Sequence, residues 1–239
     1  QASTNMELFD IETNTEVYKK GIYTAPPITE KSSPEKMVKT VYKEVIKYIE
    51  KDKFVVTLGG EHSVSIGAIK AFGINYSDLT VLQIDAHSDL RQKYEGSRYN
   101  HACVMARAKE VCKVVQVGIR SMDKEEMEYV IPANMFYAHN INACKNNEWM
   151  HDVVKSLTGN VYITIDLDAF DPAFLPSTGT PEPGGLSWQQ INDLLFLVNE
   201  KKNIVGFDVA ELCPNPYAKA SDFLAAKLVY RLLSMKFKS

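Results

Sequence analysis

The sequence predicts an α/β protein, a three-layer α/β/α sandwich in which helices cover both faces of a mainly parallel central sheet. Two observations carry this prediction. Short apolar runs alternate with segments of helical periodicity along most of the chain, which is typical of strand-helix-strand units with right-handed crossovers. Several runs are almost wholly apolar, as expected of parallel strands that are buried on both faces.

Five strong apolar runs predict strands, and a weaker one is expected near Met135–Tyr137. The strong runs are rich in β-branched residues and are about as long as typical strands. They are Phe54–Leu58, Leu79–Ile84, Val114–Val117, Val161–Ile165 and Ile204–Val209.

The first predicted helix begins after Ser33-Pro34, because Ser can cap a helix and Pro suits its first position, and it runs to Glu50. Before it, Tyr23–Pro27 predicts a short extended piece that is stopped by prolines. Further helices are predicted by the spacing of apolar residues at Ser63–Phe72, Ala102–Glu110, Asp123–Tyr129, Glu148–Ser156, Ser187–Asn199 and Ser221–Leu233.

The composition suits one globular domain over residues 1–239, with 45% hydrophobic and 24% charged residues. The net charge is −3 and no block of Lys or Arg appears, so we expect no nucleic-acid partner. No apolar run approaches the roughly 18 residues that span a bilayer, and no signal segment opens the chain, which favours the cytoplasm. Because the chain opens on Gln1, we expect it to be part of something longer.

The four cysteines show no C-x-x-C spacing. A chain of this size does not need disulfides to fold, so we expect buried or half-buried reduced thiols. They are Cys103, Cys112, Cys144 and Cys213.

Acidic and histidine clusters follow four of the five strong strands. A single Asp at a strand end is usually a helix cap, but the carboxyl ends of parallel strands share one edge of a sheet, where ligands bind. Unpartnered groups there would cost several kcal/mol in desolvation, so a cation is expected. The clusters are Gly59-Gly60-Glu61-His62-Ser63, Asp85-Ala86-His87-Ser88-Asp89, Asp166-Leu167-Asp168-Ala169-Phe170-Asp171-Pro172 and Asp208-Val209-Ala210-Glu211.

Spacing excludes two familiar metal sites. The segment after Asp166 is not an EF-hand loop, since that loop needs Asp or Asn in place of Phe170 and Gly in place of Asp171. Glu61-His62 is not part of an H-E-x-x-H zinc motif, because the order is reversed and no second His follows. A mixed carboxylate and imidazole site remains.

The number of candidate ligands favours two metal ions over one. Six side chains are too many for a four-coordinate zinc but suit two ions bridged by carboxylates and a water. Oxygen-rich donors with one imidazole per ion favour Mn²⁺, with Fe²⁺, Co²⁺ or Zn²⁺ as competitors. We interpret His139 and His151 as ordinary surface or half-buried histidines. The candidate ligands are His62, Asp85, His87, Asp89, Asp166 and Asp168.

Three of these clusters resemble the signatures of the ureohydrolase (arginase and agmatinase) family. The resemblance runs in order from about Val55 to Leu233, and the third motif is followed by Ser177-Thr178-Gly179-Thr180-Pro181-Glu182-Pro183-Gly184-Gly185. It implies an arginase-like fold and two Mn²⁺ ions per subunit, bridged by Asp85 and Asp166. One ion would be held by His62, Asp85, Asp89 and Asp166, and the other by Asp85, His87, Asp166 and Asp168.

The resemblance also implies catalytic roles. His101 matches a proton shuttle, Glu211 a guanidinium-binding acid, and Thr180 a residue that orients Glu211, while Asp89 serves in catalysis as well as in metal binding. The chemistry agrees, because a guanidinium resists attack until metal ions lower the pKa of water and an acid protonates the leaving amine. The alternatives are a helix-capping role for His101 and a solvated strand-end carboxylate for Glu211.

The loop Tyr94–Arg107 resembles the agmatinase version, and lacks the polar His-Gly version with which arginases grip an α-amino acid. This favours agmatine as the substrate, which would give putrescine and urea in polyamine biosynthesis. The segment Leu212–Pro216 departs from the commoner agmatinase sequence. The rival activities are arginase, guanidinobutyrase and formimidoylglutamase, and a catalytically silent metal-binding subunit is the alternative outside the enzymes. The resemblance further implies a homotrimer or homohexamer, and a family domain whose N-terminal strand and loop are missing here.

Overall fold

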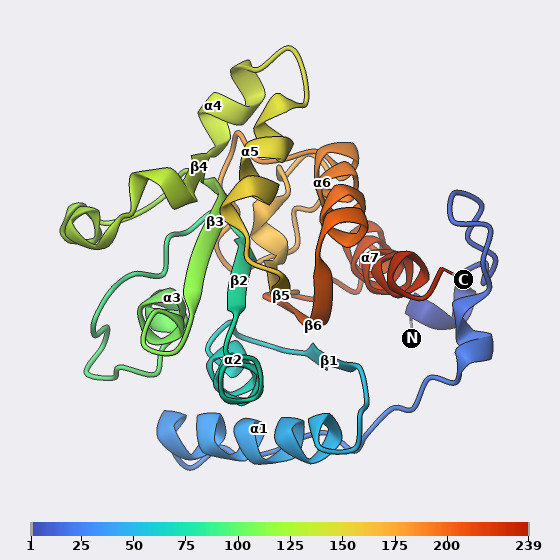
Figure 1. Cartoon of the computed structure of the whole chain (residues 1–239), viewed down its shortest axis with the longest axis horizontal. Helices are drawn as coiled ribbons and strands as arrows, with labels where there is room; N and C mark the ends of the chain where they lie inside the picture. The colour runs from blue at the N-terminus through green and yellow to red at the C-terminus, as the bar shows by residue number, and fades with distance from the viewer. Residues whose placement is uncertain (1, 239) are drawn as a thin grey trace.

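A six-stranded sheet runs through the middle of the molecule (Figure 1). The structure is a computed structural model that describes residues 2–238. The strand order is β1-β6-β5-β2-β3-β4, and each neighbouring pair is parallel, which confirms the predicted mainly parallel sheet. The strands are β1 (Val55–Leu58), β2 (Leu79–Ile84), β3 (Lys113–Ile119), β4 (Met135–Tyr137), β5 (Asn160–Asp166) and β6 (Asn203–Ala210).

Helices cover both faces of the sheet, so the predicted three layers are confirmed (Figure 1). On one face lie α2 and α3, with α1 packed outside α2, and their apolar side chains form one core with the sheet. On the other face α5, α6 and α7 form a second core. The helices are α1 (Pro34–Ile49), α2 (Val64–Asn75), α3 (Val104–Ala108), α4 (Ala138–Ala143), α5 (Glu148–Ser156), α6 (Trp188–Lys201) and α7 (Ala220–Lys236).

Capping side chains set the beginnings of α1 and α6. The Ser33 side chain accepts a hydrogen bond from the Lys36 N–H and Pro34 takes the first helical position, as the sequence predicts. At α6 the Ser187 and Gln190 side chains form a reciprocal capping box. Local sequence therefore determines where both helices begin.

The predicted helix Ala102–Glu110 is wrong in extent. A 3-10 turn, His101–Cys103, precedes a short α3, and the N–H groups of Met105 and Ala106 donate to the Asp89 carbonyl. The chain is tied there to a tertiary partner, which limits regular helix. Two other departures are that the predicted helix at Asp123–Tyr129 is the 3-10 helix Lys124–Tyr129, and that α4 was not predicted.

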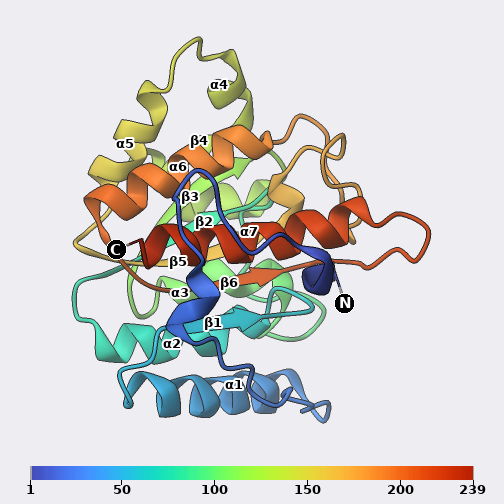
Figure 2. The same cartoon turned by 90° about the vertical axis from the view of Figure 1, so that its right-hand side faces the viewer.

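The N-terminal segment crosses the outer face of α7 (Figure 2). Tyr230 donates a hydrogen bond to the Leu8 carbonyl, and the guanidinium of Arg231 is paired with Asp10 and Glu12. Residues 22–31 have no regular structure, so the piece at Tyr23–Pro27 takes no part in the sheet.

The four cysteines are unpaired, but the predicted burial is correct for only two of them. Cys103 is buried and Cys112 half-buried, whereas Cys144 and Cys213 are exposed. The exposed pair lies in loops, where an apolar side chain has no sheet or helix to pack against: Cys144 ends α4 and Cys213 follows β6.

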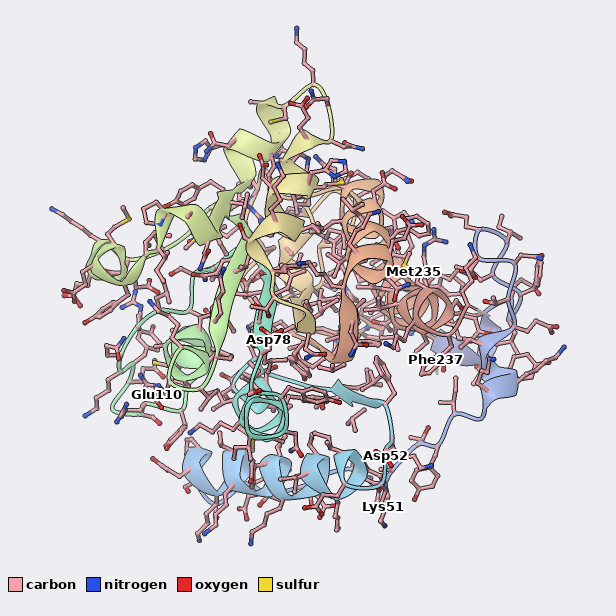
Figure 3. All side chains as sticks on the ribbon, viewed as in Figure 1. Lys51, Asp52, Asp78, Glu110, Met235 and Phe237 are labelled. Carbon is pink, nitrogen blue, oxygen red and sulfur yellow. The ribbon has the colours of Figure 1, made fainter. Side chains whose placement is uncertain are left out.

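The two ends of the sheet carry different residues. Asp52, Asp78 and Glu110, labelled in Figure 3, come shortly before β1, β2 and β3 and so mark the amino ends of these strands. The acidic and histidine clusters follow β1, β2, β5 and β6 and lie at the opposite, carboxyl end. These four strands are direct neighbours in the sheet, in the order β1-β6-β5-β2.

Candidate metal centre

Two groups of ligand-type side chains meet at the carboxyl ends of β2 and β5. In each group the donor atoms lie within 4.8 Å of one another, and Asp85 belongs to both. We refer to them as the His62 group, made of His62, Asp85 and Asp166, and the His87 group, made of Asp85, His87 and Asp168. The structure thus brings together candidates that lie up to 106 residues apart (168 − 62) in the sequence.

The His62 group is buried. The His62 ring nitrogen Nδ1 lies 3.3 Å from Asp85 Oδ2, 3.1 Å from Asp89 Oδ2 and 3.4 Å from Asp166 Oδ2. Among the described atoms, neither His62 Nδ1 nor Asp89 Oδ2 has a hydrogen-bond partner. Asp89 therefore lies beside the His62 group, and its Oδ2 and the Nδ1 of His62 are buried polar atoms without a hydrogen bond among the described residues.

A hydrogen-bond chain fixes the ring of His62. Thr164 donates its hydroxyl hydrogen to Asp208 (2.7 Å), so its oxygen can accept the Nε2–H of His62, 2.8 Å away. Asp208 is fully buried and is held on its other side by Tyr162, whose hydroxyl lies at 2.6 Å. Because Thr164 takes the Nε2–H, Nδ1 is the ring nitrogen that faces the carboxylates and that would bind a metal ion.

The His87 group is more open. His87 Nδ1 lies 2.9 Å from Asp168 Oδ2 and 3.7 Å from Asp85 Oδ1. The other ring nitrogen, Nε2, points to Glu182 at 3.9 Å, and 27% of the side chain is exposed. Asp166 belongs to only one of the two groups, so its bridging role stays a prediction.

Protons hold this cluster together when no cation is bound. Burial, together with the charges of Asp89 and Asp168, raises the pKa of Asp85 to about 7. Burial, with Asp85 and Asp168, also raises the pKa of Asp166 well above its usual range. For His87, burial opposes the charge, but Asp168 outweighs it and raises the pKa to about 9. Carboxylates that hold protons, beside orphaned ligand atoms, are the donor set that divalent cations would neutralise.

The backbone is strained at two candidate residues. Asp89 has φ 53° and Glu211 has φ 65°, in the left-handed region that residues with a side chain rarely adopt. Such a conformation costs of the order of 1–3 kcal/mol, and it persists where the surrounding structure imposes it. The Asp89 carbonyl is held by two N–H groups of α3, and the Glu211 N–H donates to the Gly60 carbonyl at 2.7 Å.

His101 and Glu211 lie on the rim of the centre. His101 Nδ1 is 3.1 Å from Glu61 Oε1, and the hydrogen bond to Glu61 raises the pKa of the imidazole. Tyr94 packs edge-on against the ring, with centroids 5.6 Å apart. The capping role considered for His101 belongs to Asn100, whose side chain accepts from the Ala102 N–H. The His101 imidazole therefore does not cap the helix, and its hydrogen bond to Glu61 leaves it able to transfer a proton.

Glu211 is held by the backbone of His62. Its Oε1 accepts a hydrogen bond from the His62 N–H at 2.6 Å, and burial raises the pKa of its carboxyl group. Thr180, expected to orient Glu211, instead reaches Asp168 Oδ2 at 3.4 Å. The Thr180 loop still runs close to Glu211, because a Cβ atom on Gly179 would stand 4.0 Å from Glu211 Oε2, but the Thr180 hydroxyl is directed to Asp168.

Several side chains with a place in the centre were absent from the predicted set. Thr164 lies two residues before Asp166, so strand alternation could have placed it on the same face. Arg120 follows β3 directly, but a lone basic residue at a strand end carries no signal by itself. His139 and His151, interpreted as ordinary histidines, are exposed and lie outside both ligand groups.

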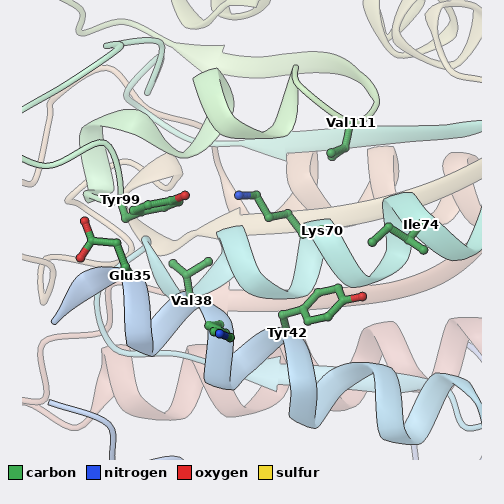
Figure 4. Close-up of a pocket in the computed structure, with 8 residues that line it drawn as sticks. Glu35, Val38, Tyr42, Lys70, Ile74, Tyr99 and Val111 are labelled. Carbon is green, nitrogen blue, oxygen red and sulfur yellow. The ribbon is translucent and has the colours of Figure 1, made fainter. Parts of the chain in front are cut away.

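A groove on the described surface is separate from the centre (Figure 4). It lies between α1 and α2 and has a volume of about 440 Å³. Lys70 lies over the ring of Tyr99 there, with 5.0 Å from Nζ to the ring centroid. None of the residues that line it is a candidate ligand.

A parallel α/β fold with two adjacent ligand groups sharing a carboxylate defines the class of binuclear metal hydrolases. The family model described as the arginase family matches residues 1–234, and the chain belongs to that family. Enzymes of this family are binuclear metal enzymes. The chain is an agmatinase-like ureohydrolase, a hydrolase that acts on C–N bonds of guanidines.

Individual relatives agree with this assignment. The chain is 37% identical over 244 residues to the N(1)-aminopropylagmatine ureohydrolase of Synechocystis sp., covering 98% of this chain and 79% of the relative. It is 32% identical over 238 residues to the agmatinase of Pyrococcus horikoshii, covering 98% and 82%. The crystal structure of the agmatine ureohydrolase of Thermoplasma volcanium superposes with a TM-score of 0.89 at 30% identity, covering 99% of this chain and 80% of that one. No helix in the described part of the chain is both long and apolar enough to cross a bilayer.

Proposed function

We propose that the protein hydrolyses agmatine to putrescine and urea, with two Mn²⁺ ions held by His62, Asp85, His87, Asp89, Asp166 and Asp168. The observation that supports this most is the pair of ligand groups that share Asp85, with the carboxylate of Glu211 bound directly to the backbone of the ligand His62. A guanidinium held by Glu211 would then lie beside the centre.

The rim of the centre favours a substrate without a carboxylate. Glu61 and Glu182 have side chains 46% and 37% exposed, and the half-buried Glu211 lies close enough to Glu61 for that charge to act on it. Negative charges near one site attract cations and repel anions. Agmatine carries a guanidinium and an amine, whereas arginine adds a carboxylate that would face these glutamates.

The residues of the chain supply binding and proton transfer. Glu211 would accept parallel N–H bonds from the planar guanidinium and orient its carbon. When bound, the two ions would activate a water molecule for attack on that carbon. As the C–N bond breaks, the leaving nitrogen needs a proton, which His101 would donate from the ring that Glu61 holds.

A second candidate substrate is N(1)-aminopropylagmatine. The relative from Synechocystis sp., at 37% identity, bears that substrate in its name. This compound is also a guanidine without a carboxylate and carries one further cationic nitrogen, which suits the same acidic rim.

The test is urea release from purified, Mn²⁺-loaded protein, with agmatine, N(1)-aminopropylagmatine, arginine and 4-guanidinobutyrate in parallel. Formamide release from formimidoylglutamate tests the remaining rival. We expect turnover of one of the first two compounds and little of the others. Preference for arginine or 4-guanidinobutyrate would refute the substrate assignment, and no product from any compound would support the silent metal-binding subunit.

The metal, the location and the assembly are further parts of the proposal. Mn²⁺ is supported by a donor set of four carboxylates and two imidazoles, which is rich in oxygen. A cytoplasmic location and a homotrimer or homohexamer are supported by the resemblance to the ureohydrolase family. Elemental analysis and light scattering on the purified protein test the first and the last.

A further inference from the structure

The side chain of Arg120 joins three segments around the His87 group. It follows β3, and its guanidinium donates to backbone carbonyls only, among the hydrogen bonds of the described residues. The two shortest bonds run from one terminal nitrogen, Nη2, to the carbonyls of Asp168 and Glu182, both at 2.7 Å. The remaining acceptors are the carbonyls of Gly118, Ala169, Phe170, Glu182 (from Nε) and Pro183, at 3.2–3.4 Å.

The backbone of the same residue holds the motif that carries Asp85 and His87. The N–H of Arg120 donates to the Ala86 carbonyl at 2.8 Å, and the N–H of Ser121 donates to it at 3.0 Å. Ala86 lies between the two ligands, so its peptide orientation affects both of them. Arg120 is therefore bonded to the backbone of Asp168 and to the backbone of Ala86, the residue between the other two members of the His87 group.

Asp168 is fixed from two directions. Its carbonyl accepts from Arg120, and its carboxylate oxygen Oδ1 accepts the N–H of Ala86 at 3.1 Å. The neighbouring loop closes tightly over the guanidinium, because a Cβ atom on Gly185 would stand 2.7 Å from Arg120 Nη2 and 2.5 Å from the Asp171 nitrogen. The loop that follows Asp168 therefore packs against the Arg120 guanidinium and is hydrogen-bonded to it.

We propose that Arg120 is a positioning residue for the His87 group, which holds the Asp168 turn and the Glu182 loop in place for the second metal ion. The inference rests on the two-ion centre of the proposed function. A planar guanidinium with five N–H donors in a fixed fork suits several carbonyls at once, whereas a lysine ammonium offers three donors from one point. No hydrogen bond of the Arg120 side chain in the described chain reaches His62, Asp85, Asp89 or Asp166, and the ligand that it bonds directly is Asp168, so the larger effect is expected on the second ion.

The experiment compares Arg120→Gln and Arg120→Lys with the wild type, by calorimetric titration with Mn²⁺ and by elemental analysis after dialysis. Partners that orient metal ligands are typically worth 10- to 100-fold in metal affinity. We expect the second Mn²⁺ to bind about 10- to 100-fold more weakly in Arg120→Gln, with the first ion unchanged and Arg120→Lys intermediate. If Arg120→Gln does not fold, Arg120→Lys decides, and wild-type affinity for both ions in it overturns the inference.

Arg231→Gln is the matched control. Arg231 is a buried arginine whose guanidinium pairs with Asp10 and Glu12, away from the centre. We expect this variant to have a lower Tm and to bind both ions with wild-type affinity. An equal loss of metal affinity in Arg231→Gln and Arg120→Gln would show general destabilisation and overturn the positioning role.

A double variant identifies the ion. If Arg120 acts on the His87 group, then Arg120→Gln added to His87→Asn should weaken Mn²⁺ binding no further than His87→Asn alone. Additive effects overturn the inference. Failure of the proposed function gives a different result: the wild type would release no urea, while Arg120→Gln still lost the second ion.

Discussion

The His62 group and the His87 group share Asp85 but differ in how the protein holds them. His62 is 1% exposed, and its ring is tied through Thr164 to the buried carboxylate of Asp208. His87 is 27% exposed and lies against Asp168, whose turn is hydrogen-bonded by Arg120 together with the Glu182 loop. One half of the centre is therefore wholly buried, and the other half includes a partly exposed imidazole that is held by loops.

The strongest test of this comparison is the residue that the two groups share. Asp85→Ala should abolish binding of both Mn²⁺ ions and all detectable urea release, because it removes a ligand from each group. Elemental analysis and the urea assay measure the two effects. Retention of one ion with wild-type affinity would show that Asp85 is not shared.

Substitution of Glu211 should impair catalysis without impairing metal binding. Glu211→Ala should keep both ions but lower kcat/KM by on the order of 100-fold or more, since charge-assisted hydrogen bonds are worth about 1.5–3 kcal/mol each. Glu211→Gln keeps the acceptor for the His62 N–H and is the matched control for charge. Normal turnover in either variant would exclude Glu211 as the guanidinium anchor.

The difference in burial predicts unequal effects on stability. In metal-free protein, His62→Asn should reduce the free energy of unfolding by about 3–5 kcal/mol, because it leaves buried carboxylates without their cationic partner. His87→Asn, at the partly exposed position, should cost less, about 2 kcal/mol, because Asp168 stabilises the charged imidazole while water screens part of that attraction. Urea unfolding with a chelator present measures both, and equal losses would contradict the distinction between core and loop.

The smallest effect is expected at Glu61. The hydrogen bond to Glu61 raises the pKa of His101, so the imidazole stays charged to higher pH. If His101 donates a proton, activity falls as pH rises through this pKa, and Glu61→Gln should move that alkaline limb to lower pH. The loss of kcat at neutral pH should be at most about five-fold, since exposed pairs are worth about 1 kcal/mol or less. An unchanged pH profile would argue against His101 as the donor, and Glu61→Asp should restore it.

The strands of the sheet and the proximity of the candidate ligands could both be predicted from the sequence. Continuous apolar runs identified the strands, and the rule that parallel strands share a carboxyl edge brought His62, Asp85 and Asp166 together. Their roles as ligands stay a prediction, as do those of His101 and Glu211.

Tertiary contacts that produce no periodic pattern in the sequence could not be predicted. The break between the 3-10 turn at His101 and α3 depends on the Asp89 carbonyl, and the bond from Thr180 to Asp168 depends on how a loop folds back. Arg120 acts through carbonyl groups, which every residue possesses, so no pattern of side chains indicates its partners.

The left-handed backbone at Asp89 and Glu211 has a consequence for how this protein could be improved. Asparagine tolerates that conformation better than most residues, and at position 89 it would also remove a negative charge from a crowded carboxylate cluster. Asp89→Asn should therefore raise the Tm of the metal-free protein but remove a candidate metal ligand. Selection for thermal resistance alone would thus lead away from the enzyme, so a screen for hardier variants must include turnover from its first round.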